Sequence, residues 1–184
     1  HPQPEALLHA SIFFDFRPLY GDAHLAERLR DDLLDRTRAA PLFLRLMSAN
    51  ALASAPALGL IRDFRFDDPD HHPHTIELKM YGSRPFVDAA RVLALAHGVR
   101  QTSTVERLEA VAARAPFGDD VHAIVDGFWF IQSLRLRNQL HAEPVREPNR
   151  VDPESLNEMD RTVLKEALRR ARALQQILRT EYRL

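Results

Sequence analysis

The sequence predicts a mainly α-helical fold, an antiparallel helical bundle with one small β-hairpin. Apolar residues recur at three- and four-residue spacing over several stretches of roughly 12 to 25 residues, which is typical of amphipathic helices. The connections between these stretches are short, which favours antiparallel neighbours. The exception is the region 55–80, where short apolar runs are bounded by turn residues, as in strands.

Two helices are expected in the first forty residues. Pro4 suits a first helical turn, and apolar residues follow at four-residue spacing, so we expect a buried helix over 4–16. The run 11–16 is also compatible with a strand, because short apolar runs do not distinguish the two. A second helix is expected over 24–38, and its inward side chains would be Leu25, Leu29, Leu33 and Leu34.

A helix over 41–53 and then the β-hairpin should follow. The strand-like runs 60–66 and 75–80 flank an acidic, histidine-rich tip over 67–74. Carboxylates and imidazoles bind metals, but the two prolines of the tip place it in a loop without fixed geometry, so we predict no metal site.

Four later helices have clear boundary signals. The helix over 86–97 should bury Phe86, Ala90, Leu93 and Ala94 and stop at Gly98. Ser103 and Glu106 form a capping box for a helix with Val105, Leu108, Val111 and Ala112 inward. Asp119 and Asp120 should cap a long helix that ends near His141. Asp152-Pro153 should cap the last helix, whose apolar stripe is Leu156, Met159, Val163, Ala167, Ala171, Leu174 and Leu178.

Composition indicates a cytosolic globular protein. The chain has 184 residues, 45% of them hydrophobic and 28% charged, and it has no cysteine. These values exclude disulfides and cysteine-based zinc sites, and we find neither a signal peptide nor a run long enough to cross a membrane. Because the sequence begins at His1 without a methionine, we interpret it as a fragment of a longer protein.

The net charge of −1 is unevenly distributed. Residues 161–184 carry seven basic and two acidic side chains, so the rest of the chain has a net charge of −6. The basic end could steer an anionic ligand, or it could be the solvated face of a helix.

Polar residues gather around one strand end and two helix starts. This set offers four cations and two other polar groups, and arginine can contact a phosphate through two N–H groups, so it suits a polyanion such as a nucleotide. Surface ion pairs are the alternative interpretation. The set is Lys79, Arg84, Asp88, Arg91, Thr104 and Arg107.

Two further groups are candidates for binding. Asp15 and Arg17 precede a turn and could hold a phosphate or form an ion pair. Arg135 shares the inward face of its helix with Ile131, and Gln132 and Gln139 stand beside it, which predicts either a buried polar network or a ligand site.

A ribonuclease active site is a weaker alternative. Arg135 and His141 have five residues between them, which fits the Arg-x4–6-His spacing of helical-bundle ribonucleases. General acid–base catalysis by His141 would need a second positioned group.

Gly82-Ser83 before a helix is similar to the start of a nucleotidyltransferase active site. That chemistry needs Asp-x-Asp or Asp-x-Glu and a third carboxylate to hold two divalent metals. No such pair follows Gly82-Ser83 at suitable spacing, so we predict no catalytic residue and no metal site in this chain.

Several motifs, taken in order, resemble one bacterial family. They are Phe14-Asp-Phe-Arg17-Pro-Leu-Tyr-Gly21-Asp22, Glu77-Leu-Lys79, Pro85-Phe-Val-Asp88-Ala-Ala-Arg91, Thr104-x-x-Arg107-Leu108, Arg135-Leu-x-x-Gln139 and Val151-Asp-Pro. The family is the C-terminal substrate-binding domain of signal-transduction nucleotidyltransferases, which are linked to CBS or cyclic-nucleotide-binding modules and related to the PII-protein uridylyltransferase.

The resemblance implies a domain division and a function. Residues 1–40 would be the end of a nucleotidyltransferase core with its exit helices, and residues 41–184 the helical substrate-binding domain. The domain would bind a nucleotide, an acceptor protein or both beside the N-terminal core, which is missing here. Mg²⁺ and an NTP would be the cofactors of the parent enzyme, and none is expected for this fragment. A protein-interaction or homodimerisation module is the alternative; we expect neither nucleic acid nor a membrane as partner.

Overall fold

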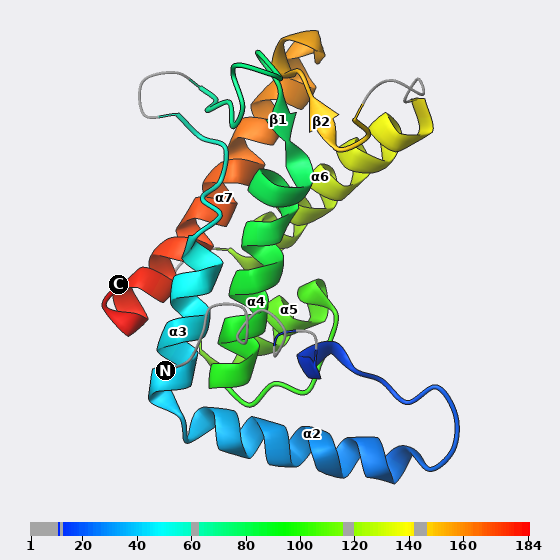
Figure 1. Ribbon diagram of the computed structural model, residues 1–184, viewed down its shortest axis with the longest axis vertical. Coiled ribbons are helices and arrows are strands. Elements are labelled where there is room, and N and C mark those ends of the chain that lie inside the picture. Colours follow the sequence, from blue (N-terminus) through cyan, green and yellow to red (C-terminus); the bar gives the residue numbers. More distant parts are fainter. Residues whose placement is uncertain (1–10, 12, 60–62, 116–119, 142–146) are drawn as a thin grey trace. The chain divides into compact units, whose positions relative to one another are not determined.

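The computed structural model describes residues 11, 13–59, 63–115, 120–141 and 147–184. Its helices and strands are shown in Figure 1. The predicted mainly α-helical fold is confirmed. The helices are α2 (Ala23–Arg38), α3 (Pro41–Leu52), α4 (Arg84–Ala96), α5 (Thr104–Arg114), α6 (Val121–His141) and α7 (Glu158–Tyr182), and the strands are β1 (Ile76–Glu77) and β2 (Arg150–Val151).

The chain divides into two compact units. Unit 1 comprises residues 1–53, 87–118 and 177–184, and unit 2 comprises 54–86 and 119–176. Both α4 and α7 are divided between the units. This spatial division differs from the sequence division at residues 40 and 41, which stays a prediction.

In unit 1, α2 begins after Asp22, whose side chain accepts a hydrogen bond from the His24 N–H at 2.9 Å. Of the four leucines predicted to face inward, Leu34 is buried and Leu33 is half-buried. The prediction was wrong for Leu25 and Leu29, which are 59% and 51% exposed. The buried residues of α2, Leu34 and Thr37, both lie near its C-terminal end.

Most of the predicted helix over 4–16 lies outside the described residues. Within them, Phe13–Asp15 forms one 3-10 turn, so neither a long helix nor a strand is present at 13–16. The turn buries Phe14, whose ring lies 5.9 Å from that of Phe43 in α3. An aromatic contact thus holds this segment on α3.

The helix boundaries of α4 and α5 follow the sequence signals. Gly98 has a φ of +62°, the left-handed conformation that ends helices, and the inward face predicted for α4 is buried. Ser103 precedes α5 with extended backbone, but its side chain makes no capping hydrogen bond. The predicted start of α5 is therefore confirmed, whereas the capping box is wrong.

Among the described residues, the β-hairpin predicted between 60–66 and 75–80 does not form. In unit 2, β1 pairs antiparallel with β2, so that Ile76 lies opposite Val151 and Glu77 opposite Arg150. The run that was expected to be the other strand contributes one isolated bridge between Leu58 and Phe64, and residues 60–62 lie outside the described part. Local alternation could not reveal the pairing, because the partner of β1 comes from a distant part of the sequence.

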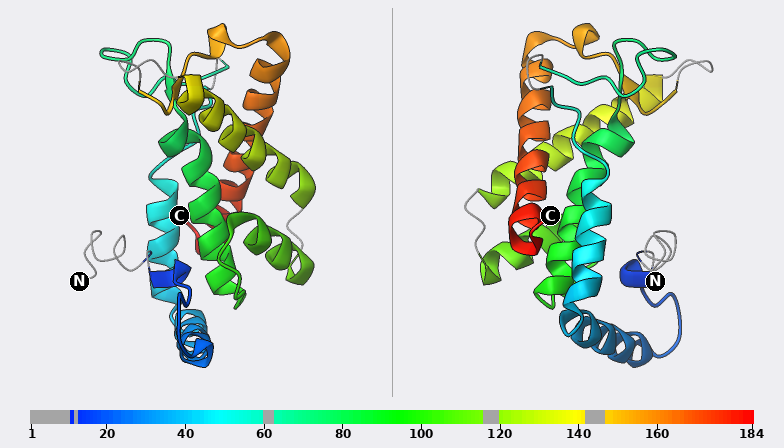
Figure 2. Two further views of the ribbon diagram at one scale, coloured as in Figure 1. Left: turned by 90° about the vertical axis from the view of Figure 1, so that its right-hand side faces the viewer. Right: turned by 60° about the vertical axis from the view of Figure 1, so that its left-hand side comes forward.

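The helices α6 and α7 pack closely within unit 2 (Figure 2). A Cβ atom at Gly127 of α6 would lie 3.1 Å from the Cα of Ala167 in α7, so the glycine permits this approach. The helix α6 begins after Asp120, whose carboxylate accepts the His122 N–H at 2.9 Å as predicted; Asp119 lies outside the described residues.

The predicted cap of α7 was wrong. Asp152 caps a short 3-10 turn, Pro153–Ser155, and α7 begins at Glu158 after Asn157, whose side chain accepts the Asp160 N–H at 2.8 Å. Met159 and Val163, which were predicted to face inward, lie within α7 but are 77% and 37% exposed. The buried stripe consists of Leu164, Ala167, Leu168, Ala171, Leu174 and Leu178.

Candidate anion-binding site

The residues predicted to bind substrate fall into two groups, one in each unit. Unit 1 holds Asp15, Arg17, Asp88, Arg91, Thr104 and Arg107, and unit 2 holds Lys79, Arg84, Arg135 and Gln139.

In unit 1, two arginines converge on one carboxylate. The two oxygens of Asp15 accept hydrogen bonds from Arg91 Nη2 at 2.6 Å and from Arg107 Nη2 at 2.7 Å. Arg91 Nη1 also donates to Asp88 at 3.0 Å. Partial burial raises the pKa of Asp15, but the hydrogen bond from Arg91 and the charge of Arg107 outweigh it, so the pKa lies below its usual value.

Arg107 has a structural role in addition to its positive charge. Its side chain is buried and donates to the backbone carbonyls of Gln101 at 2.9 Å and Phe14 at 3.1 Å. Burial lowers the pKa of this guanidinium. These bonds fasten the turn 13–15 onto α5, and they use the groups that a ligand would otherwise contact.

A small crevice beside Arg107 does not add a substrate pocket. It is lined by Phe14, Phe16, Arg30 and Gln101 among others, and its volume of about 10 Å³ suits one water molecule. Arg30 lies over the Phe16 ring at 4.4 Å and donates to the Phe16 carbonyl. Of the other predicted residues in unit 1, Arg17 is exposed and Thr104 is half-buried at the first position of α5.

In unit 2, Arg135 is surrounded by neutral acceptors. Its Nη1 donates to Gln132 Oε1 at 2.7 Å and to Ser83 Oγ at 3.2 Å. Its Nε and Nη2 both donate to the side-chain oxygen of Asn149, at 3.2 and 3.1 Å. Among the described residues, no carboxylate pairs with Arg135, so its positive charge is not neutralised there.

The local fold explains how Ser83 reaches Arg135. Residues Lys79–Ser83 form a π-helical turn between β1 and α4, a conformation that is frequent at functional sites. A Cβ at Gly82 would lie 3.1 Å from a methyl carbon of Ile131, so the glycine lets the turn approach α6 closely. Buried Ser83 then donates to the Lys79 carbonyl at 3.3 Å and accepts from Arg135.

The other predicted residues of unit 2 lie on the same elements. Lys79 is exposed at the start of the π-helical turn, not at the end of a strand as predicted. Arg84 begins α4 and contacts the Met80 sulfur at 3.7 Å. Gln139 is exposed on α6 and donates to Asn149 Oδ1 at 3.3 Å. The structure therefore joins Gln139 to Arg135 through Asn149.

The sequence interpretation missed the roles of Ser83 and Asn149. The similarity of Gly82-Ser83 to a catalytic signature gives no indication that Ser83 contacts Arg135. Asn149 stands between Pro148 and Arg150, in a stretch without helical periodicity. The sequence therefore does not indicate which helix it contacts. Its approach to α6 depends on β1–β2 pairing, which local sequence does not show.

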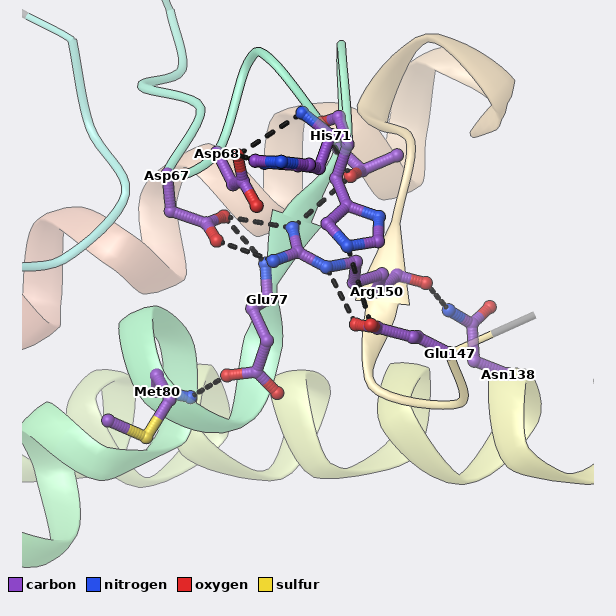
Figure 3. A network of polar contacts seen from close by, with 10 residues as sticks. Asp67, Asp68, His71, Glu77, Met80, Asn138, Glu147 and Arg150 are labelled. Atoms are coloured by element: carbon purple, nitrogen blue, oxygen red, sulfur yellow. Dashed lines mark hydrogen bonds and ion pairs between the residues drawn. The ribbon is translucent and has the colours of Figure 1, made fainter.

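A strap, defined here as residues 147–151, carries Asn149 and is firmly held (Figure 3). Arg150 donates to Asp67 at 2.8 Å, to Glu147 at 2.8 Å and to the Thr75 hydroxyl at 3.3 Å. Burial lowers the pKa of Arg150, but the hydrogen bonds to the two carboxylates outweigh it and the pKa is raised. Asn138 of α6 donates to the Arg150 carbonyl.

Two histidines of the histidine-rich tip contact carboxylates. His71 lies 3.0 Å from Asp68, and His72 lies 3.4 Å from Glu147 of the strap. The hydrogen bond from His71 lowers the pKa of Asp68. In the described part of the chain, no three acidic or histidine side chains are arranged to hold a metal ion.

The basic side chains of α7 have structural partners within unit 2. Lys165 pairs with Asp63, Arg161 pairs with Glu154 at 2.8 Å, and Arg172 donates to the Leu58 carbonyl at 2.8 Å. Gln175 donates to the Ser54 carbonyl at 2.9 Å. Lys165, Arg172 and Gln175 thus hold Asp63, Leu58 and Ser54 against α7, so part of the basic excess has a role in folding.

Two remaining observations concern the alternatives. His141 is the last residue of α6, and its side chain lies outside the described part, so the ribonuclease hypothesis gains no support. Among the helices of the described ranges, none is long and apolar enough to cross a membrane.

The fold defines a helical module in which Arg135 donates to the neutral side chains of Gln132, Ser83 and Asn149. The family comparison specifies the class further. Residues 41–182 match the family described as "putative nucleotidyltransferase substrate binding domain", and the chain belongs to this family. The comparisons with curated proteins and with solved structures gave no match.

Proposed function

We propose that this domain binds the nucleotide of a signal-transduction nucleotidyltransferase through Arg135. Membership of a substrate-binding family supports a binding role. The observation that carries the proposal is the set of neutral acceptors around Arg135, which position the guanidinium and leave its charge available.

Phosphate is the ligand chemistry that fits this site best. Arginine offers planar N–H pairs that match two phosphate oxygens, and such charge-assisted hydrogen bonds are stronger than neutral ones. Lys79 is the first residue of the π-helical turn that carries Ser83, and Arg84 follows the turn as the first residue of α4, so both add positive charge close to Ser83 in the sequence. Lysine supplies a flexible point charge, which suits the other phosphates of a nucleotide.

This role is binding, and the chemistry belongs to the parent enzyme. Two-metal nucleotidyl transfer needs carboxylates that hold Mg²⁺ beside the reacting phosphate. Those groups would come from a uridylyltransferase-like core that also binds the NTP. Asp15, Arg91 and Arg107 stay predicted substrate-binding residues, but their mutual pairing favours a structural role.

Protein interaction is a second candidate, favoured by one observation. Trp129, Leu136 and Leu140 of α6 are 55%, 56% and 72% exposed, and their spacing of seven and four residues places them on one helix face. An acceptor protein or a second copy could cover such a face. Light scattering would distinguish self-association from a monomer that binds only nucleotide.

Calorimetric titration with UTP, ATP, CTP and GTP in the presence of Mg²⁺ tests the proposal. We expect binding by the wild type and at least about a tenfold loss in Arg135→Gln, since hydrogen bonds to charged groups contribute about 1.5–3 kcal/mol. Arg137→Gln is the matched control, because Arg137 lies on the same helix but pairs with Asp160 at 3.0 Å. The absence of heat at millimolar nucleotide, or equal affinity of Arg135→Gln and wild type, would refute it.

A further inference from the structure

The side-chain oxygen of Asn149 receives more donors than it can satisfy well. Arg135 Nε, Arg135 Nη2 and Gln139 Nε2 all point to it, at 3.2, 3.1 and 3.3 Å. An amide oxygen has two lone pairs, so three donors must share them. The two distances from Arg135 are longer than is usual for a charge-assisted hydrogen bond.

We propose that Asn149 is a placeholder: its amide oxygen occupies the edge of the Arg135 guanidinium formed by Nε and Nη2, where a ligand would bind. A phosphate group, which offers two oxygens to this edge, displaces it. This inference rests on the proposed function, because it concerns the same Arg135 site. It adds the atoms that receive the ligand and the residue that competes with it.

The geometry of the guanidinium identifies the edge. Nη1 is directed to Gln132 and Ser83, and both contacts remain in place when a ligand binds elsewhere on the guanidinium. The Nε–H and the neighbouring Nη2–H point the same way and currently share the single oxygen of Asn149. A phosphate offers one oxygen to each N–H, which replaces one shared neutral acceptor by two charged ones.

Only the Asn149 side chain has to move. Its backbone carbonyl accepts a hydrogen bond from the Leu78 N–H at 2.8 Å, and the next two residues form β2. The ion pair between Arg150 and Asp67, shown in Figure 3, holds the strap against the segment that carries Asp67, and the pair between Arg150 and Glu147 braces the strap itself. Rotation about the Asn149 side-chain bonds therefore opens the edge while the backbone stays paired.

Gln139 strengthens the argument for an anion. Its amide N–H₂ group also donates to the position that Asn149 Oδ1 occupies. A phosphate oxygen in that position would receive this donor together with those of Arg135. The three donors thus form a preformed oxyanion cradle, with Asn149 as its internal occupant.

The placeholder makes opposite predictions for two substitutions. Asn149→Ala removes the competitor, so pyrophosphate should bind about 3- to 10-fold tighter, the change that corresponds to a typical intramolecular hydrogen bond. Asn149→Asp keeps the size but places a carboxylate on the same edge, so pyrophosphate binding should fall at least about tenfold. Asn149→Ser is a second, smaller replacement that should also bind tighter, should the alanine variant fold poorly.

Calorimetric titration with inorganic pyrophosphate, with folding checked by circular dichroism, decides the question. Asn138→Ala is the matched control, because Asn138 donates to the strap at the Arg150 carbonyl and, among the described residues, no hydrogen bond joins it to Arg135. The control should bind as the wild type does. Weaker binding by Asn149→Ala would show a direct ligand contact and overturn the placeholder, and equal effects of the Asn138 and Asn149 variants would overturn it as well.

The design separates the two proposals. Loss of pyrophosphate binding in Arg135→Gln supports the Arg135 site whatever the Asn149 variants do. Binding by Asn149→Ala alone, with none detectable in the wild type, would support the placeholder. If neither protein binds pyrophosphate, both the site and the placeholder fail.

Discussion

Replacing Arg150 by glutamine should destabilise unit 2 strongly. The side chains of Arg150 and Asp67 are 12% and 8% exposed and lie 2.8 Å apart, so the change leaves a buried carboxylate without a cation. Breaking such a pair costs about 3–5 kcal/mol. Asp67 keeps the hydrogen bond from the Glu77 N–H at 3.1 Å, which reduces the expected loss to about 2–4 kcal/mol.

Thermal unfolding followed by circular dichroism measures this loss. For a chain of this size, about 2–4 kcal/mol corresponds to a fall in Tm of about 4–16 °C. Asp67→Asn/Arg150→Gln should lose less than the sum of the two single variants, because neither partner is then left charged and alone. Arg137→Gln serves as the control, since its pair with Asp160 is 50% and 20% exposed and should contribute less than about 1 kcal/mol. A fall in Tm for Arg150→Gln no larger than that of the control would refute the reasoning.

Two further predictions concern stability. Asp15→Asn should cost about 1 kcal/mol at neutral pH, a value reduced for solvent screening because Asp15 is 37% exposed. The pKa of Asp15 is lowered in the folded state, so its contribution is present above the unfolded value of 3.8 and is lost as the pH falls through the folded pKa. Melting curves of wild type and variant should therefore converge in acid, and a constant difference across pH would contradict the ion-pair explanation. Gly127→Ala should lower Tm although alanine favours helices by about 1 kcal/mol, because its Cβ would lie 3.1 Å from the Cα of Ala167; a raised Tm would show that α7 shifts freely.

Helices were more predictable than the pairing of strands. Gly98 and Asp120 mark helix boundaries by local chemistry, and both act as expected. The hairpin and the cap at Asp152 failed for different reasons. The partner of β1 is distant in sequence, whereas Asp152 does cap a turn, but a short 3-10 turn that ends before α7 begins.

The candidate site was predictable in part, because a helical repeat reveals faces but not partners. Arg135 and Gln132 were placed together by spacing, and their hydrogen bond is present. Asn149 could not be placed, since its contact with Arg135 depends on the strap, and the strap depends on the pairing of β1 with β2. The contact between Ser83 and Arg135 depends on the π-helical turn, and the sequence of that turn does not indicate its conformation.

The polar cluster around Asp15 in unit 1 and the one around Arg135 in unit 2 differ mainly in the hydrogen-bond partners of their arginines. Arg91 and Arg107 are bound to carboxylates and backbone carbonyls, so a phosphate that entered there would have to displace charged partners. Arg135 is bound to neutral amides and a hydroxyl, and an incoming phosphate would replace a weaker partner by a stronger one. Arginine therefore ties the turn 13–15 to its helices in unit 1, whereas the neutral partners of Arg135 in unit 2 support the proposal that an anion binds there.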